Sequence, residues 1–183
     1  TYDYRPARGE STDTAIGSAL DGAGQESGPA FLPGHAMVWD PLRAVNLPHS
    51  ALPVIPTLVS VPGACTHVEL QGRCPTNPGE IAILQADATT YRLHLGSRLN
   101  PYGDPMPFTV VGIYRPSAGS EAFWFSSGRL QTIPGHTLPQ VTPSRPAPWI
   151  TTQAGIQLRH DPWFVTVDQH PGHRVHVGHL RHP

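Results

Sequence analysis

Lysine is absent from this 183-residue chain, and all 12 of its basic residues are arginine. Without lysine, the chain cannot form a Schiff base or supply the phosphate-binding lysine of a Walker-type loop. Charged residues make up only 14% of the sequence, and the formal net charge is −1. Proteins that bind nucleic acid normally carry clustered basic residues on one face, so the composition argues against nucleic acid as a partner.

The sequence also lacks a hydrophobic run that could cross a membrane. The stretch 44–68 carries no formal charge and is long enough to span a bilayer as a helix. Four prolines interrupt this stretch, and each removes an amide donor and clashes with the preceding helical turn. We therefore expect extended chain at 44–68. The sequence also shows no signal peptide. Because the chain begins with Thr1 rather than Met, we expect it to be a fragment of a longer protein.

Cysteine is scarce, and eight residues separate Cys65 from Cys74. Zinc sites and thioredoxin-type motifs use tighter spacing, and a zinc site would need two further ligands. A disulfide within a hairpin fits the spacing better. It would stabilise the fold by about 2–3 kcal/mol and would require an oxidising compartment. The alternative is a pair of free cysteines buried as small hydrophobic side chains.

Recognised catalytic motifs are missing as well. The chain contains no Gly-x-Ser-x-Gly elbow, no His-Glu-x-x-His helix and no glycine-rich phosphate loop. His160, Asp161 and Asp168 could combine with a serine, but residues of these types also occur in the solvated loops of any chain of this length. We therefore expect no enzymatic activity and no required cofactor, with a hydrolase of unrecognised motif as a remaining alternative.

Glycine and proline are abundant, with 18 and 22 residues. They follow no period and remain below the proportion typical of disordered chains, so they indicate short strands joined by many turns. The sequence predicts an α+β fold, mostly strands with one or two short helices. We expect strands at 36–39, 57–61, 66–70, 80–84, 108–114 and 163–167, and short helices at 15–20 and 85–91.

The runs 57–61 and 66–70 are separated by Pro62 and Gly63, which favour a turn. They could form a hairpin or two successive strands. By composition, the chain divides into an extended, proline- and glycine-rich part at 1–56, a core at 57–169 and a flexible histidine-rich tail at 170–183.

Motifs in the middle of the chain occur in a distinctive order. They are 71–75 (Gln-Gly-Arg-Cys-Pro), 77–83 (Asn-Pro-Gly-Glu-Ile-Ala-Ile), 93–99 (Leu-His-Leu-Gly-Ser-Arg-Leu) and 108–116 (Phe-Thr-Val-Val-Gly-Ile-Tyr-Arg-Pro). The ordered set resembles the periplasmic core domain of MacB-like and FtsX-like ABC transporter permeases, in a form similar to that of actinobacterial permeases. Ser97 stands where the family commonly has Asp, and Cys74 lies inside the Gly-Arg-x-Pro motif.

The resemblance implies a MacB-like fold on the extracellular face of the cell membrane. Transmembrane helices of the same parent chain would flank the domain, and a cytoplasmic ATPase subunit or domain would supply the energy. The domain would be non-catalytic and would couple permease movement to an exported substrate or an extracellular partner protein. The alternative is a secreted module that binds a ligand or a metal.

Residues within these motifs have expected structural roles. Gly72 and Gly79 permit tight turns with positive φ, and Glu80 can accept hydrogen bonds from turn amides. Gly96 reverses the chain, and Gly112 indicates a bulge or a close backbone neighbour within its strand. The core should include Ile81, Ile83, Val110 and Ile113.

The tail carries a regular row of histidines, which are His170, His173, His176, His179 and His182. Imidazole binds zinc, copper or nickel, and this spacing would place neighbours on one side of a helix. Pro171 and Gly172 oppose a helix at its start, so we expect adventitious metal binding rather than a specific site. The aromatic residues of 123–125, together with Trp163, could line a ligand groove or fill the core.

Overall fold

The computed structural model of the protein describes residues 2–27, 31–41, 45–51, 53–54, 56–104, 106–118, 148–158 and 164–171. The strands are β1 (Tyr2–Tyr4), β2 (Phe31–Pro41), β3 (Thr57–Ser60), β4 (Val68–Gly72), β5 (Glu80–Leu84), β6 (Arg98–Leu99), β7 (Phe108–Pro116), β8 (Trp149–Ile150) and β9 (Phe164–Pro171). The helices are α1 (Thr12–Ser27), the 3-10 helix η2 (Ala64–His67), α2 (Gln85–Thr90) and α3 (Gln153–Gln157). The predicted α+β class, with a mostly stranded core, is confirmed.

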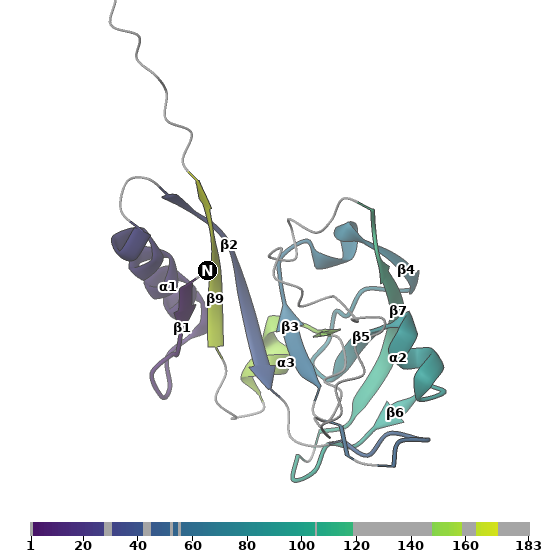
Figure 1. Cartoon of the computed structure of the whole chain (residues 1–183). Coiled ribbons are helices and arrows are strands. Elements are labelled where there is room, and N and C mark those ends of the chain that lie inside the picture. Colours follow the sequence, from purple (N-terminus) through teal and green to yellow (C-terminus); the bar gives the residue numbers. More distant parts are fainter. Residues whose placement is uncertain are drawn as a thin grey trace, which may run out of the picture.

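One mixed sheet of nine strands runs through the described residues in the order β1-β9-β2-β3-β8-β5-β7-β4, with β6 pairing β7 beside this path. The pairs β3–β8 and β5–β7 are parallel, and the other pairs are antiparallel. Helix α1 covers the end formed by β1, β9 and β2, whereas α2 lies at the other end beside β5 and β7 (Figure 1). The boundary predicted between the N-terminal part (1–56) and the core (57–169) lies between β2 and β3 in the sequence. These two strands are neighbours in the sheet.

Helix α1 forms where a short helix was predicted, but it is longer than 15–20. Ser11 caps it, because the Ser11 hydroxyl accepts a hydrogen bond from the Thr14 amide at 3.2 Å. Ala15, Ala19 and Ala23 lie on one side and are at most 1% exposed. These small side chains let the helix backbone approach β2 and β9 closely.

Strand β2 is longer than the predicted strand at 36–39, and it pairs with β9 along most of its length. The register between them shifts after Pro33, which is consistent with the tolerance of proline at irregular strand positions. Strand β9 continues to Pro171, so His170 has a backbone partner at Leu32. The predicted start of the tail at residue 170 thus lies within β9.

Strands β3 and β4 form close to the two predicted runs 57–61 and 66–70, but they do not pair with each other. Strand β3 pairs with β2 and β8, whereas β4 lies at the edge of the sheet beside β7. The structure therefore has two successive strands and not a hairpin at this point.

The central strand β5 is buried on both faces. Ile81 and Ile83 are 0% exposed and belong to a large hydrophobic cluster that also contains the alanines of α1. Ala82 and Leu84 point to the other face and join a second cluster. Because both faces of β5 are buried, its sequence is a continuous aliphatic run. In a strand with one exposed face, hydrophobic residues would alternate with polar ones.

Strand β7 contains a bulge that changes which face its side chains occupy. Its register with β5 shifts around Val111. Val110 therefore packs in the first cluster, while Tyr114 packs in the second. The predicted burial of Val110 is confirmed, but Ile113 is only half-buried because it follows the bulge on the margin of the first cluster.

Candidate functional site

The sequence segments that carry the family resemblance lie against one another around β7. Backbone hydrogen bonds join each of the other three motifs to this strand, in addition to the regular sheet pairing. The motifs therefore form one structural unit. The bonds are Arg73 N to Val111 O at 3.0 Å, Thr109 N to Gly79 O at 2.8 Å and Gly96 N to Val110 O at 2.8 Å.

Two of the motif glycines allow this close assembly. Gly72 has a φ of 90°, and a Cβ there would lie 2.4 Å from the Val111 carbonyl oxygen. At Gly112, a Cβ would lie 2.7 Å from the Arg73 carbonyl oxygen. Both the close backbone neighbour and the bulge that the sequence suggested at Gly112 are therefore present. The turn glycines Gly79 and Gly96 have φ values of 84° and 87°.

The carboxylate of Glu80 organises the turn between β4 and β5. It accepts hydrogen bonds from the amides of Thr76 at 2.9 Å and Asn77 at 3.1 Å, as the sequence predicted. It also forms an ion pair with both terminal nitrogens of Arg73, a contact that was not predicted from the sequence. The Arg73 guanidinium and these amides hold the pKa of Glu80 well below its usual range. The same hydrogen bond raises the pKa of Arg73.

Cys65 and Cys74 form a disulfide with a Cα–Cα distance of 5.9 Å. Cys65 belongs to η2, and Cys74 follows the end of β4. The bridge therefore joins the two ends of the edge strand β4. Both cysteines of the chain are consumed in it.

A buried polar group lies between α2, β7 and β8. Asp87 is 6% exposed, and the indole nitrogen of Trp149 donates a hydrogen bond to its Oδ2 at 3.3 Å. Burial raises the pKa of Asp87 to about 6, against the opposing effect of the Trp149 hydrogen bond. The Tyr114 hydroxyl donates to the Pro148 carbonyl at 2.6 Å, and burial together with Asp87 raises its pKa.

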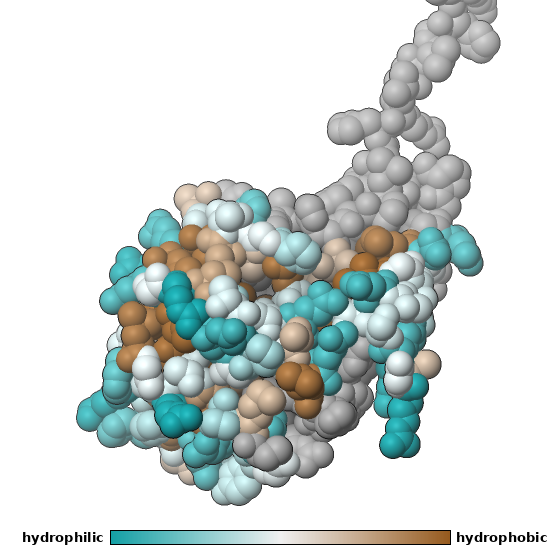
Figure 2. Space-filling view, turned by 180° about the vertical axis from the view of Figure 1, so that it is seen from behind, coloured by the Kyte–Doolittle hydropathy of each residue, from teal (hydrophilic) through white to brown (hydrophobic). Residues whose placement is uncertain are grey.

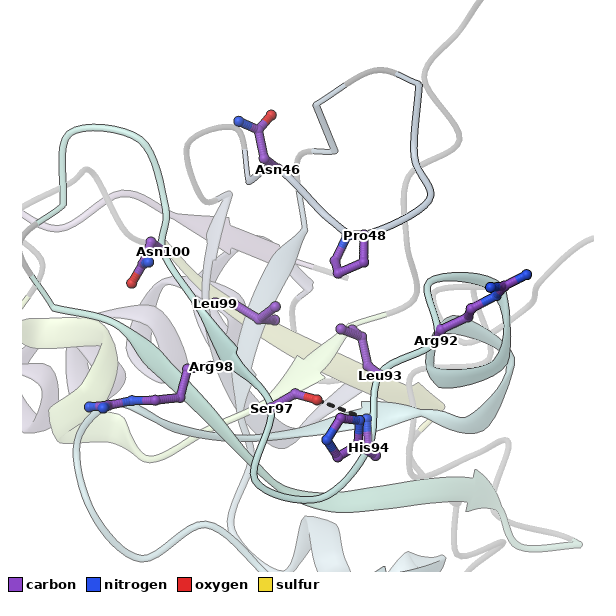
Figure 3. A pocket seen from close by; sticks show the side chains of 9 residues that line it. All are labelled: Asn46, Pro48, Arg92, Leu93, His94, Ser97, Arg98, Leu99 and Asn100. Carbon is purple, nitrogen blue, oxygen red and sulfur yellow. Dashed lines mark hydrogen bonds between the residues drawn. The ribbon is translucent and has the colours of Figure 1, made fainter.

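A pocket of about 600 Å³ opens beside this unit (Figure 3). Leu93 and Leu99, which are 7% and 3% exposed, belong to the core cluster and form its apolar part. Figure 3 shows Arg92 and Arg98 on opposite sides of these leucines, with their side chains extending outward. The remaining lining residues are Asn46, Pro48, His94, Ser97 and Asn100.

The pocket lining contains two arginines and a histidine but no acidic residue. The Ser97 hydroxyl accepts a hydrogen bond from the backbone amide of His94 at 2.9 Å, so it fixes the loop and is not paired with the imidazole. No ion pair joins Arg92 or Arg98 to another of the described residues. The pocket is therefore locally positive in a chain with a net charge of −1.

No sequence pattern predicted this pocket. Its signal in the sequence is the alternation of polar residues with leucine from Arg92 to Leu95, which overlaps the start of the motif at 93–99. The contribution of Asn46 and Pro48 could not be predicted, because it depends on the bridges of Val45 to distant residues. These bridges lead to Val54 and Pro101.

Several predicted features lie outside the described residues. These are 123–125, Trp163, His160, Asp161, His173, His176, His179 and His182. The described part of the chain contains no group of three or more His, Cys, Asp or Glu that could hold a metal ion. Within that part, no helix is both long and apolar enough to cross a bilayer.

Hydrophobic side chains reach the surface in separate patches on the face shown in Figure 2, with hydrophilic residues between them. The large hydrophobic residues that are exposed in the described chain are Leu95, Tyr102 and Leu158, at 39%, 56% and 50% exposure. Scattered residues of this kind are normal for a protein surface. Among the described residues, we therefore take the pocket as the candidate site.

No protein-family model matches this sequence, and no curated protein matches it. Among solved structures, the chain is similar to one described as "a domain of a putative Permease protein from Porphyromonas gingivalis". The two share 15% identity with a TM-score of 0.41, over 82% of this chain and 67% of that chain. A likeness this distant assigns neither a family nor a function.

Proposed function

We propose that this chain is the extracellular domain of an ABC transporter permease of the MacB-like and FtsX-like type. The observation that carries the proposal is the assembly of the motifs that resemble this family into one unit around β7. Gly72, Gly112 and Glu80 each have a contact that requires the residue found there. The motifs therefore share one structural unit, and this supports the proposal.

The disulfide supports a location outside the cytoplasm. Structural disulfides form and persist in oxidising compartments, and cytoplasmic thiols are normally kept reduced. The bond between Cys65 and Cys74 joins the two segments that flank the edge strand β4. A bond in this position holds the fold together. An extracellular domain is consistent with this bond.

The sheet topology supports insertion of the domain between two segments of a larger chain. Strand β1 pairs with β9 in antiparallel orientation, and Tyr2 is opposite Val167. The chain thus enters β1 and leaves β9 at the same end of this strand pair. Ends that lie close together allow a domain to be inserted into another chain, so this topology is compatible with the proposal.

We further propose that the domain is non-catalytic and couples permease movement to an exported substrate or partner. The groups whose pKa values are displaced have structural partners: Glu80 and its partner Arg73 hold a turn, and Asp87 and Tyr114 lie in the core. None of them lines the pocket. The described lining of the pocket holds no nucleophile in hydrogen-bonding contact with a base, which supports a role in binding rather than in catalysis.

The parent gene and the topology of its product test this proposal. We expect predicted membrane helices on both sides of the domain. In intact cells, a membrane-impermeant maleimide should label Cys65 and Cys74 only after an impermeant reductant has opened the disulfide. Labelling that requires cell lysis would contradict the extracellular location, and a parent gene without membrane helices would favour a secreted binding module.

The coupling role requires a separate experiment. Replacing residues 2–171 by a short linker in the parent permease should leave membrane assembly with the ATPase intact and abolish export. Normal export by the shortened permease would contradict the coupling role while leaving the location of the domain unaffected.

A further inference from the structure

We propose that the pocket beside α2 and β6 binds an organic anion with two acidic groups separated by an apolar spacer. Binding at this pocket would depend only on the described residues, whether or not the chain belongs to a transporter. The arrangement of charge around the pocket and the backbone conformation of Arg92 support this proposal.

The lining of the pocket matches such a ligand in charge and polarity. Arg92 and Arg98 lie on opposite sides, and Leu93 and Leu99 lie between them (Figure 3). A guanidinium group binds carboxylate or phosphate through two parallel hydrogen bonds. Both arginine side chains are exposed, so each can turn over a ligand that occupies the pocket. The leucines would contact the apolar part of that ligand.

Arg92 occupies a backbone position at which glycine is the usual residue. Helix α2 ends in a Schellman motif, in which the Leu93 amide donates to the Ala88 carbonyl at 2.8 Å and the Arg92 amide donates to the Thr89 carbonyl at 3.4 Å. The φ of Arg92 is 51°, in the left-handed region that disfavours side chains with a Cβ. An arginine here is thus less favourable for the fold than glycine would be.

The Arg92 side chain does not compensate for this conformation within the described structure. The carbonyls of Ala88 and Thr89 already accept bonds from backbone amides, so the guanidinium is not needed as a helix cap. His49, which follows the lining residue Pro48, also has a positive φ of 62°. Among described residues, these two are the non-glycine residues with positive φ, and strain of this kind concentrates at functional sites.

A series of straight-chain dicarboxylates, from malonate to sebacate, tests the proposal on the folded chain. Binding is followed by calorimetry and by shifts of backbone amide resonances. We expect affinity to peak at an intermediate chain length, because shorter dicarboxylates cannot reach both arginines and longer ones no longer fit between them. R92G and R98Q should each weaken binding by at least about fivefold. R8Q, which removes an exposed arginine in another loop, should bind as the parent does.

The R92G variant separates a ligand-binding role from a structural one. Because glycine suits the left-handed position, R92G should melt at the same or a higher temperature while it loses affinity. A lower melting temperature would show that Arg92 serves the fold, and the proposal would then fail. It would also fail if no dicarboxylate bound saturably, if affinity showed no optimum in length, or if R8Q weakened binding as much as R98Q.

Discussion

The carbonyl oxygen of Arg73 lies so close to Gly112 that a Cβ at Gly112 would be 2.7 Å away from it. The same Cβ would be 2.9 Å from the Cβ of Ala82 on the neighbouring strand β5. The backbone around Gly112 is thus held from two sides, by the motif that contains Arg73 and by β5. Because of these two contacts, even the methyl group of alanine would not fit at Gly112 without movement of its neighbours.

Replacing Gly112 by alanine should destabilise the protein by about 1–3 kcal/mol, because backbone atoms must move to admit the methyl group. Urea unfolding measures the change. Gly17 provides a matched control, since it lies in helix α1 with nothing within 4 Å of an added Cβ. Gly17→Ala should stabilise by about 0.5–1 kcal/mol. Equal stability of Gly112→Ala and the parent would contradict the packing described around β7.

Glu80→Gln should destabilise the protein at neutral pH by about 1–2 kcal/mol, because charged hydrogen bonds to the Thr76 and Asn77 amides are lost. The folded-state pKa of Glu80 is lowered, so its contribution is present above its ordinary pKa of 4.5 and is lost as pH falls below that value. The difference between the parent and the variant should therefore shrink in acid.

Chemical unfolding at several pH values measures this effect, with Glu69→Gln as the control. Glu69 is an exposed glutamate of the edge strand β4, and its substitution should leave stability almost unchanged. A Glu80→Gln variant as stable as the parent at neutral pH would show that the turn does not depend on the carboxylate.

Asp87→Asn should stabilise the protein at neutral pH by about 1–3 kcal/mol, the size expected from the raised pKa of a buried carboxyl group. Asparagine can still accept the hydrogen bond from Trp149. Because the folded-state pKa is raised to about 6 from an ordinary value of 3.8, the penalty is absent below the lower value and complete above the higher one.

The pH dependence distinguishes this effect from a general change in packing. Parent stability should decline between these two pKa values as pH rises, and the variant should lack that decline. Thermal or urea unfolding across this range provides the measurement, and Asp21→Asn on the exposed face of α1 is the control. A variant that is less stable than its parent at neutral pH would show that the carboxylate is favourable where it lies.

Opening the disulfide should destabilise the protein by about 2–3 kcal/mol, because the unfolded chain regains the freedom of the closed loop. The double variant Cys65→Ser and Cys74→Ser should show a similar loss in urea unfolding. Mass spectrometry after alkylation without reductant should find an unmodified chain. Two alkylated cysteines in the native protein would contradict the bond.

Sequence patterns predicted the elements that are rich in aliphatic residues. The runs at β5 and β7 have the β-branched composition of buried strands, and both form close to the predicted residues. Short elements such as β1 and β8 were not predicted, since two or three residues carry no period. They become strands because β9 and β3 offer them partners.

Helix α1 and strand β2 show how misleading composition can be. Glycine and serine obscured the length of α1, although Ala15, Ala19 and Ala23 at intervals of four already marked its buried side. Pro33 obscured β2, whose extent depends on pairing with β9. The pocket was not predicted for a related reason, because it requires Asn46 and Pro48 to meet residues that lie far along the sequence.

The antiparallel pairing of β1 with β9 also determines how the domain would respond to tension. Tyr2, at the start of β1, lies opposite Val167, so the chain enters β1 and leaves β9 on the same side of this strand pair. A force that pulls the ends apart would load the β1–β9 hydrogen bonds one after another, starting at Tyr2, instead of shearing them together. Strand β9 would keep its longer ladder with β2 while β1 peeled away. The domain would therefore yield first at β1 and helix α1, leaving the disulfide-bridged end of the sheet unloaded.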